Sequence, residues 1–369
     1  MSFERTIVFA GGGSGGHLYP ALAVIEELRR VRPEVRCVFW CSRRGVDRQI
    51  LESAALRIPG LSWEPLFPVP QGRSWFRRLT SSSAFAVGFV RASRRLRLLR
   101  PNLVVGLGAF ASVSGVFAAV QRGIGVALLE SNTIPGRATQ MLARHARRIF
   151  TGLPLELEWS RQLGELAEDV GVPVRADVAE LTRRPVTAGA RRVLLILGGS
   201  QGASRLNELV CQALSQRGVL RDGWSVLHQT GERDLLRVRS CYAGLGLAAE
   251  AVAFLPDLPR RLGDAGLVIS RAGAVTLAEL ACASVPSILV PLSSAAGDHQ
   301  RKNAMRFEKV GAAVMVEEQQ AGAVVQLQCL VGELTAETGR RLDMAACLGM
   351  LARPHAAGVV ARRLLELVD

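Results

Sequence analysis

Two glycine-rich turns carry the strongest chemical signal in the sequence. The first is Gly11-Gly12-Gly13-Ser14-Gly15-Gly16-His17 and the second is Gly198-Gly199-Ser200-Gln201-Gly202-Ala203, and each separates a short apolar run from a helical pattern. A turn in that position presents backbone N–H groups and the positive end of a helix dipole to an anion. The two turns therefore predict two phosphate-binding sites, and in the second the Ser200 hydroxyl could help to hold a diphosphate.

His17 stands at the start of the helix that follows the first turn, and it is a candidate general base because an imidazole titrates near neutral pH. The alternative is a histidine that only shapes the turn. The same turn satisfies G-x-G-x-x-G through Gly11, Gly13 and Gly16, the pattern of dinucleotide sites. An NAD site would need an acidic residue after the next strand, where the sequence is Cys41-Ser42-Arg43-Arg44. Those arginines could accept the 2′-phosphate of NADP, so an NADP-dependent oxidoreductase stays an alternative.

A third strand-to-helix junction, 270–279, and the segment 298–304 add polar groups suited to a nucleotide sugar. We expect Glu279 in the first turn of the helix, where its carboxylate either accepts hydrogen bonds from two ribose hydroxyls or only complements the helix dipole. Gln300 offers both a donor and an acceptor to sugar hydroxyls. The sequence contains no metal-site spacing, no nucleophile elbow and no Walker-type loop. We therefore expect neither a bound metal nor a cofactor.

The elements that must position these residues are strands and helices in alternation, because short apolar runs alternate with helical patterns along the chain. Such alternation is typical of βαβ units around a parallel sheet. Each half opens with a strand, a glycine turn and a helix, and the first helix is expected from about Pro20 to Arg30. We predict an α/β fold with two doubly wound domains, 1–172 and 173–352, facing a central cleft, and a C-terminal helix, 356–368, that can complete the first domain. The expected strands are 6–10, 35–41, 103–106, 126–130, 149–152, 193–197, 225–228, 251–254, 267–270 and 287–290.

The positive charge of the 369-residue chain is concentrated in its first half. Lys and Arg number 46 against 32 Asp and Glu, a net charge of +14, and residues 1–165 hold 23 basic and 11 acidic residues, or +12. Arginines mix with aromatic and aliphatic residues at 75–78 and 85–100. This mixture predicts docking on an anionic membrane surface. Nucleic acid is not expected as a partner, because no RRM, helix-turn-helix or zinc-finger pattern is present.

The uncharged window 101–121 is long enough to cross a bilayer. It begins with Pro101-Asn102 and contains Gly106, Gly108 and Gly115. Those residues favour a strand, a glycine loop and a helix over a membrane span.

Five segments occur in the order and spacing typical of one protein family: GGSGGHLYPALAV, GGSQGA, HQTG, SRAGAVTLAE and DHQRKNA. Together they resemble the MurG family, the peptidoglycan N-acetylglucosamine transferases, over nearly the whole chain. The resemblance implies a GT-B fold with UDP-N-acetylglucosamine bound to the C-terminal domain. It also implies an inverting transfer of N-acetylglucosamine to the C4 hydroxyl of the muramoyl sugar of lipid I. The product would be lipid II, made by a peripheral protein at the cytoplasmic face of the plasma membrane.

The resemblance also implies roles for matching positions of this sequence. In the first half, His17 matches the candidate base, and the first loop and a position near the sugar are matched by Ser14, Gly15, Gly16 and Asn132. For the donor, Arg175 matches a donor-site arginine, Ser200 the serine of the phosphate loop, Leu255 the residue that meets uracil through its backbone, and Gln300 a sugar-contacting glutamine. The segment that holds the nucleotide is matched by Ala274, Val275, Thr276, Leu277, Ala278 and Glu279, with Glu279 on the ribose.

The sequence departs from the family pattern mainly on the acceptor side. Ser14 stands where threonine is usual, and LESN at 129–132 stands where HEQN is typical. In the loop GLGAFASVS, Ala109, Phe110 and Ser114 replace a glycine, a tyrosine and a proline. A UDP-sugar transferase with a different lipid acceptor is therefore the main alternative.

Overall fold

The computed structural model describes residues 5–68, 75–108, 110–183, 191–198, 202–216, 218–293 and 296–369. The chain forms two compact units. Unit 1 comprises Met1–Arg175 and His355–Asp369, and unit 2 comprises Ala176–Pro354. The structural boundary follows Arg175, whereas the sequence-based boundary follows residue 172.

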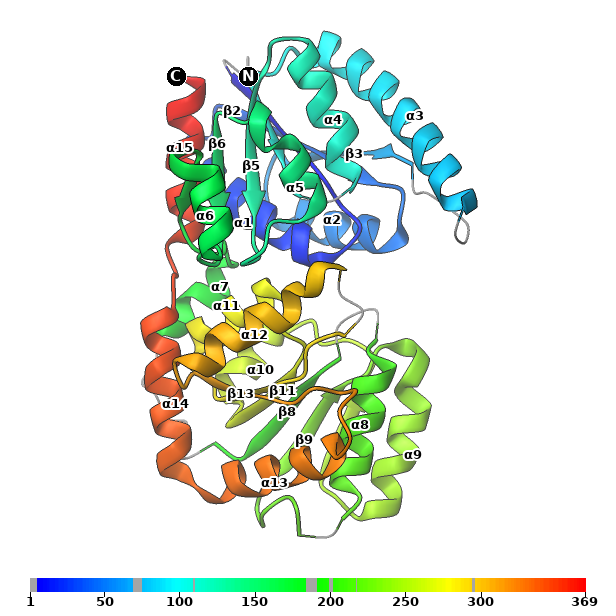
Figure 1. Ribbon diagram of the computed structural model, residues 1–369, viewed down its shortest axis with the longest axis vertical. Helices are drawn as coiled ribbons and strands as arrows, with labels where there is room; N and C mark the ends of the chain where they lie inside the picture. The colour runs from blue at the N-terminus through cyan, green and yellow to red at the C-terminus, as the bar shows by residue number, and fades with distance from the viewer. Residues whose placement is uncertain are drawn as a thin grey trace. The chain divides into compact units, whose positions relative to one another are not determined.

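Unit 1 is built on a parallel sheet of seven strands with helices on both faces (Figure 1). In spatial order the strands are β3 (Ser62–Phe67), β2 (Val35–Ser42), β1 (Arg5–Ala10), β4 (Leu103–Gly106), β5 (Gly125–Glu130), β6 (Arg148–Thr151) and β7 (Ala167–Asp169). The helices are α1 (Gly15–Val31), α2 (Gly45–Arg57), α3 (Trp75–Leu99), α4 (Phe110–Gln121), α5 (Arg137–Leu142), α6 (Leu157–Leu163) and α15 (Ala356–Val368).

Unit 2 repeats the plan with six parallel strands. Their order is β10 (Ala249–Val252), β9 (Ser225–Gln229), β8 (Val193–Leu197), β11 (Leu267–Ser270), β12 (Ser287–Leu289) and β13 (Ala313–Met315). Its helices are α7 (Ala176–Ala179), α8 (Ser204–Leu214), α9 (Leu235–Leu245), α10 (Leu258–Asp264), α11 (Ala274–Ala283), α12 (His299–Lys309), α13 (Ala323–Ala336) and α14 (Thr338–Leu351). The prediction of two doubly wound α/β domains is confirmed.

The core of unit 1 lies on both faces of its sheet. Successive residues of a strand point to opposite faces, so Ile7 and Phe9 of β1 pack into one buried cluster and Val8 into another. The first cluster includes apolar residues of α15 at helical spacing, namely Val360, Ala361, Leu364 and Leu365. The last helix of the chain therefore packs in the core of unit 1, against α1.

Two uncharged or apolar stretches have the length of a membrane span. Window 101–121 forms the buried strand β4 and helix α4, as its glycines and serines predict. Among the described residues, the stretch Thr338–Val368 is long and apolar enough to cross a bilayer by composition alone. It is not one helix, because α14 ends at Leu351 and α15 begins at Ala356. Helix α14 packs against α11 in unit 2, and α15 packs against α1 in unit 1.

The first helix begins earlier than expected. Proline favours the first turn of a helix, so the sequence indicates a start at Pro20. Helix α1 instead begins at Gly15 and contains Pro20. His17 therefore lies inside the first turn of α1.

Candidate functional site

Each sheet has one point where the strand order reverses, and the glycine turns lie there. The reversal falls between β1 and β4 in unit 1 and between β8 and β11 in unit 2. Ligands of doubly wound sheets bind beyond the carboxyl ends of the strands at this point. The turn 11–14 follows β1, and the turn 198–203 follows β8. The topology thus brings both predicted turns to the ligand-binding edge of their sheets.

The turn of unit 1 is held by a buried carboxylate that the sequence analysis did not identify. Asp47, at the start of α2, is fully buried. Its oxygens accept the N–H of Gly13 at 2.8 and 2.9 Å, the N–H of Ser42 at 3.0 Å and the hydroxyl of Ser42 at 2.6 Å. A Cβ on Gly12 would lie 2.2 Å from Asp47 Oδ2, so only glycine fits at this position. Nothing local marks Asp47, because it lies 34 residues after Gly13.

This arrangement bears on the dinucleotide alternative. Gly13 is the second glycine of G-x-G-x-x-G, the one at which the backbone approaches a pyrophosphate. Here its N–H points to Asp47, and its carbonyl accepts a hydrogen bond from Arg44 Nη1 at 3.0 Å. Both the backbone donor and one candidate 2′-phosphate ligand therefore have partners within the protein. The geometry counts against an NADP site.

His17 and the N-terminus of α1 directly follow the turn of unit 1. Ser14 is the N-cap residue, and its hydroxyl makes no capping hydrogen bond. His17 is half-buried, and its backbone N–H donates to the Ser14 carbonyl at 3.2 Å. A Cβ on Gly15 would lie 2.9 Å from the ring of Tyr19, which explains the glycine there. Arg175 stacks on that same ring, 5.3 Å from its centroid. The structure thus places Arg175 beside α1.

Asn132 is held by the glutamate of the LESN segment. Glu130, at the end of β5, is buried. Its Oε1 accepts the backbone N–H and the side-chain amide of Asn132, each at 3.0 Å. Its Oε2 accepts the N–H of Gly136 at 2.8 Å and the hydroxyl of Thr139 at 2.6 Å. Four donors engage this carboxylate, so Glu130 fixes the loop and is a poor candidate for a general base.

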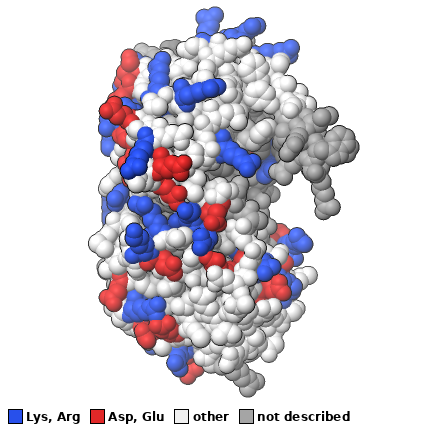
Figure 2. Space-filling view, viewed as in Figure 1, with Lys and Arg blue, Asp and Glu red and all other residues white. Residues whose placement is uncertain are grey.

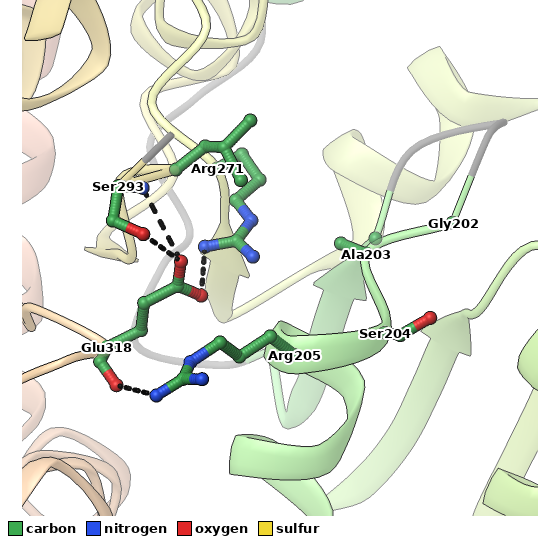
Figure 3. Close-up of a pocket in the computed structure, with 9 residues that line it drawn as sticks. Gly202, Ala203, Ser204, Arg205, Arg271, Ser293 and Glu318 are labelled. Carbon is green, nitrogen blue, oxygen red and sulfur yellow. Dashed lines mark hydrogen bonds and ion pairs between the residues drawn. The ribbon is translucent and has the colours of Figure 1, made fainter. Parts of the chain in front are cut away.

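Unit 2 has a pocket of about 370 Å³ at its switch point, a size typical of small-molecule sites. Glycine is required in its wall, because a Cβ on Gly198 would lie 2.7 Å from the Gln229 carbonyl and Gly202 has a φ of +76°. Ser200 lies outside the described residues. The lining residues are Gly198, Gly202, Ala203, Ser204, Arg205, Arg271, Leu292, Ser293 and Glu318 (Figure 3).

An ion pair in this pocket was also missed by the sequence analysis. Arg271 Nη1 lies 2.7 Å from Glu318 Oε2, and the Glu318 side chain is 2% exposed. Arg271 follows β11 directly, so its place at the switch point could have indicated a ligand contact. Glu318 follows β13, 47 residues later, and only the fold brings the two together.

The other donor-side candidates lie on elements at the same edge of the sheet. Glu279 is buried on α11, but in the second turn, because α11 begins at Ala274. The expectation of a first-turn carboxylate is therefore wrong. The alternative that Glu279 only complements the helix dipole becomes weaker, because that effect falls off within the first turn. Gln300 Oε1 accepts the N–H of the pocket residue Leu292 at 2.9 Å. Leu255 is buried in the loop between β10 and α10. The remaining matches, Ala274, Val275, Thr276, Leu277 and Ala278, lie on α11.

The HQTG segment supplies a polar network behind the pocket. His228 is fully buried, with Nδ1 2.7 Å from the Tyr242 hydroxyl and Nε2 3.1 Å from Asn207 Oδ1. Asn207 Nδ2 donates to the Thr230 carbonyl at 3.0 Å and to Asp234 at 2.9 Å. Because the Asn207 amide must face these acceptors, its oxygen faces His228, whose Nε2 then carries the proton. Burial lowers the pKa of His228 to about 3, so the ring is neutral.

Comparisons with known proteins agree with this architecture. Residues 7–151 match the glycosyltransferase family 28 N-terminal domain, and residues 193–357 match the family 28 C-terminal domain. The chain is 35% identical over 364 residues to a UDP-N-acetylglucosamine--N-acetylmuramyl-(pentapeptide) pyrophosphoryl-undecaprenol N-acetylglucosamine transferase of Anaeromyxobacter dehalogenans, covering 98% of this chain and 93% of that protein. The transferase of the same name from Myxococcus xanthus is 34% identical over 366 residues, with the same coverage.

Solved structures share the fold. The crystal structure of Acinetobacter baumannii MurG is 23% identical, with a TM-score of 0.76 and coverage of 98% of this chain and 99% of that one. A UDP-GlcNAc 2-epimerase of Neisseria meningitidis, bound to UDP-GlcNAc, is 10% identical, with a TM-score of 0.69 and coverage of 98% and 100%. At these identities the likeness shows the fold alone.

Proposed function

The chain belongs to the MurG family of N-acetylglucosamine transferases, and we propose that it moves N-acetylglucosamine from UDP-N-acetylglucosamine to the C4 hydroxyl of the muramoyl sugar of lipid I, forming lipid II. The observation that carries this proposal is the pocket at the switch point of unit 2. A glycine turn, the first turn of α8 and an arginine surround a space of nucleotide-site size there. These are the groups that a sugar nucleotide diphosphate requires.

The donor site uses the residues that line and flank this pocket. The 198–203 turn with Ser200 and the N-terminus of α8 bind the diphosphate through N–H and hydroxyl donors. Glu279, which is buried on α11, accepts hydrogen bonds from the ribose hydroxyls. Gln300, already tied to the pocket rim at Leu292, contacts the sugar. Leu255 meets uracil through its backbone, and residues 274–278 hold the rest of the nucleotide.

The reaction is a single displacement with inversion. The acceptor hydroxyl oxygen attacks the anomeric carbon, and the bond from that carbon to the diphosphate oxygen breaks. His17 accepts the hydroxyl proton, since it lies in the first turn of α1 and Glu130 is engaged by four donors. UDP leaves with the bonding electron pair, stabilised by the N–H donors of the unit 2 turn.

The acceptor side is assigned to unit 1 and to a membrane surface. Helix α3 packs through Ala84, Ala92 and Leu96, which are buried. Its exposed residues combine apolar and cationic side chains, namely Val87, Val90, Arg94, Arg97 and Leu98. Figure 2 shows basic side chains on unit 1 at the upper edge of the view with few acidic ones among them. Such a surface gains about 1 kcal/mol per basic residue near anionic lipid. The side chains of Trp75, Phe76, Arg77 and Arg78 lie outside the described part of the chain.

Release of UDP from UDP-N-acetylglucosamine, with and without a short-chain lipid I analogue, tests the proposal. We expect release that depends on the analogue. UDP binding without stimulation by the analogue would leave the donor site in place and contradict lipid I as the acceptor. Absence of UDP binding would overturn the transferase proposal as a whole.

A further inference from the structure

The buried ion pair of the unit 2 pocket joins the ends of three neighbouring strands. Arg271 follows β11, and its Nη1 donates to the Val290 carbonyl at 3.0 Å and the Pro291 carbonyl at 3.3 Å, just after β12. The same nitrogen pairs with Glu318, which follows β13. The Arg271 side chain is 14% exposed. Nη1 thus donates hydrogen bonds to two backbone carbonyls and forms an ion pair with Glu318, and these contacts fix the position of the whole group.

Within the part of the chain that the structure describes, the protein does not hold the other edge of this guanidinium, formed by Nε and Nη2, as it holds Nη1. A guanidinium carries five N–H donors, and Nε and Nη2 form a fork that fits two oxygens of one phosphate. Arg271 Nε is buried and finds no hydrogen-bond partner among the described residues. A buried donor without an acceptor is unfavourable. Figure 3 places the guanidinium in the pocket wall, between Glu318 and the turn at Gly202 and Ala203. This edge is suited to an anionic ligand.

Glu318 is held in place by hydrogen bonds that do not involve Arg271. Its Oε1 accepts the hydroxyl of Ser293 at 3.0 Å and the N–H of Ser293 at 3.4 Å. Its backbone carbonyl accepts Arg205 Nη2 at 3.3 Å. Glu318 is therefore a fixed negative charge beside Arg271, and the pair is close to neutral before a ligand arrives.

The charge of the ligand changes during the proposed reaction. The diphosphate of UDP-N-acetylglucosamine is a diester, whereas UDP carries an additional ionisable phosphate oxygen, which is largely charged at neutral pH. An unpaired arginine would hold UDP more tightly than the donor and would slow its release. A carboxylate fixed beside the arginine lowers that attraction.

We propose that Arg271 binds the donor diphosphate through Nε and Nη2, and that Glu318 is a positioning residue that orients this fork and limits its attraction for UDP. The inference rests on the proposed function, because it takes a nucleoside diphosphate as the ligand. It makes a prediction of sign that a merely structural ion pair does not make: removal of the Glu318 charge tightens UDP binding.

The test is calorimetric titration of the full chain with UDP and with uridine. Arg271→Gln weakens UDP binding about tenfold or more and leaves uridine binding unchanged within about twofold, since uridine lacks the phosphates. Glu318→Gln keeps an amide oxygen for Arg271 but removes the negative charge. It tightens UDP binding severalfold without changing uridine binding, and UDP becomes a stronger product inhibitor. In the Arg271→Gln background, Glu318→Gln gives no tightening.

Three controls separate this proposal from loss of structure and from failure of the proposed function. Glu333→Gln makes the same substitution at a carboxylate of α13 that pairs with Arg340 outside the pocket lining, and it leaves UDP binding within about twofold. Arg271→Lys keeps the charge but lacks the fork, so it weakens UDP binding less than Arg271→Gln does, whether or not the Glu318 variant folds. Thermal melting without ligand reports folding of each variant.

A Glu318→Gln protein that is folded and binds UDP and uridine more weakly together would overturn the proposal and indicate a structural ion pair. Unchanged UDP binding in Arg271→Gln would overturn it as well. In both cases the unaltered protein still binds UDP. If the unaltered protein binds no UDP, the proposed transferase function itself fails.

Discussion

The two glycine turns occupy the same topological position in their units, yet different charges lie behind them. In unit 1 the carboxylate of Asp47 accepts the N–H of Gly13 in the turn itself, and all four of its hydrogen bonds come from neutral groups. In unit 2 the carboxylate of Asp234 stands one residue further back, behind Asn207, and pairs with Arg237 at 3.3 Å. Similar sequence motifs therefore give two electrostatically different sites.

The difference shows why the turns should not be regarded as equivalent phosphate sites. An anion at the unit 1 turn would lie close to a buried carboxylate whose hydrogen bonds come from neutral groups, and it could not use the Gly13 N–H. It must rely on the first turn of α1, near Gly15 and Gly16. The unit 2 turn has Arg271 beside it and its negative charges are paired. The contrast favours the diphosphate of the donor in unit 2 and proton transfer by His17 in unit 1.

Replacement of His17 by alanine tests the unit 1 half of this contrast and should have the largest effect. Loss of a general base lowers kcat by about 10²–10⁴-fold. The KM for UDP-N-acetylglucosamine should change by less than about threefold, because the proposed contacts to the nucleotide lie in unit 2. Acceptor-dependent UDP release measures both constants. His145→Ala, also in unit 1, serves as the matched control, and equal losses in the two variants would remove His17 from the mechanism.

Asp47→Asn tests whether the carboxylate of unit 1 fixes the turn. The amide retains one acceptor oxygen for three buried donor groups and loses the negative charge. We expect a loss of about 3 kcal/mol in the free energy of unfolding, because hydrogen bonds to a charged group are worth about 1.5–3 kcal/mol each. The KM for the acceptor should rise while the KM for the donor stays constant.

Urea denaturation and steady-state kinetics measure these effects. Asp264→Asn is the control, since Asp264 is half-exposed in unit 2, and it should change stability by no more than about 0.5 kcal/mol. An Asp47→Asn protein as stable as the parent, with both KM values unchanged, would show that the different charges behind the two turns have no effect on function.

The positions of the glycine turns could be predicted from sequence because a strand, a turn and a helix are contiguous in the chain. Asp47, which holds the unit 1 turn, and Glu318, which pairs with Arg271, could not be predicted, since both reach their partners through the fold. The sequence analysis also missed three strands, β3, β7 and β13. All lie at or beside a sheet edge, and β3 carries Glu64 and Pro65 in place of an apolar run.

The register of individual residues was harder to predict than the elements that carry them. The sequence predicts Glu279 in the first turn of α11, but the helix begins at Ala274, earlier than that prediction requires, so Glu279 falls in the second turn. The sequence predicts the start of α1 at about Pro20, five residues too late, because proline favours the first turn of a helix. In both cases the backbone geometry of a glycine-containing turn decided the helix start, and such a turn tolerates several continuations.

The smallest predicted effect is a pH dependence of stability that arises from the neutral His228 and is confined to unit 2. Burial holds the pKa of His228 near 3, against about 6.5 in the unfolded chain. Between these values the unfolded state binds one more proton than the folded state, so stability falls as the pH falls below 6.5. At pH 5 the loss is about 2 kcal/mol, from a shift of about 1.5 pH units at 1.36 kcal/mol each.

The titration of Asp234 does not account for the loss of stability that His228 causes between pH 6.5 and pH 5. Burial alone would raise the pKa of Asp234, but hydrogen bonds from Ser204, Asn207 and Arg237 lower it overall. Its stabilising effect is therefore complete above its ordinary value near 3.8 and is lost only at lower pH.

Hydrogen exchange of the β9 amides at pH 7 and pH 5 measures unit 2 by itself. His228→Gln should remove most of the difference between the two pH values, and His355→Gln, an exposed histidine of unit 1, should leave it intact. A difference that persists in His228→Gln would assign the pH dependence to other groups and show that the neutral network does not distinguish unit 2 from unit 1.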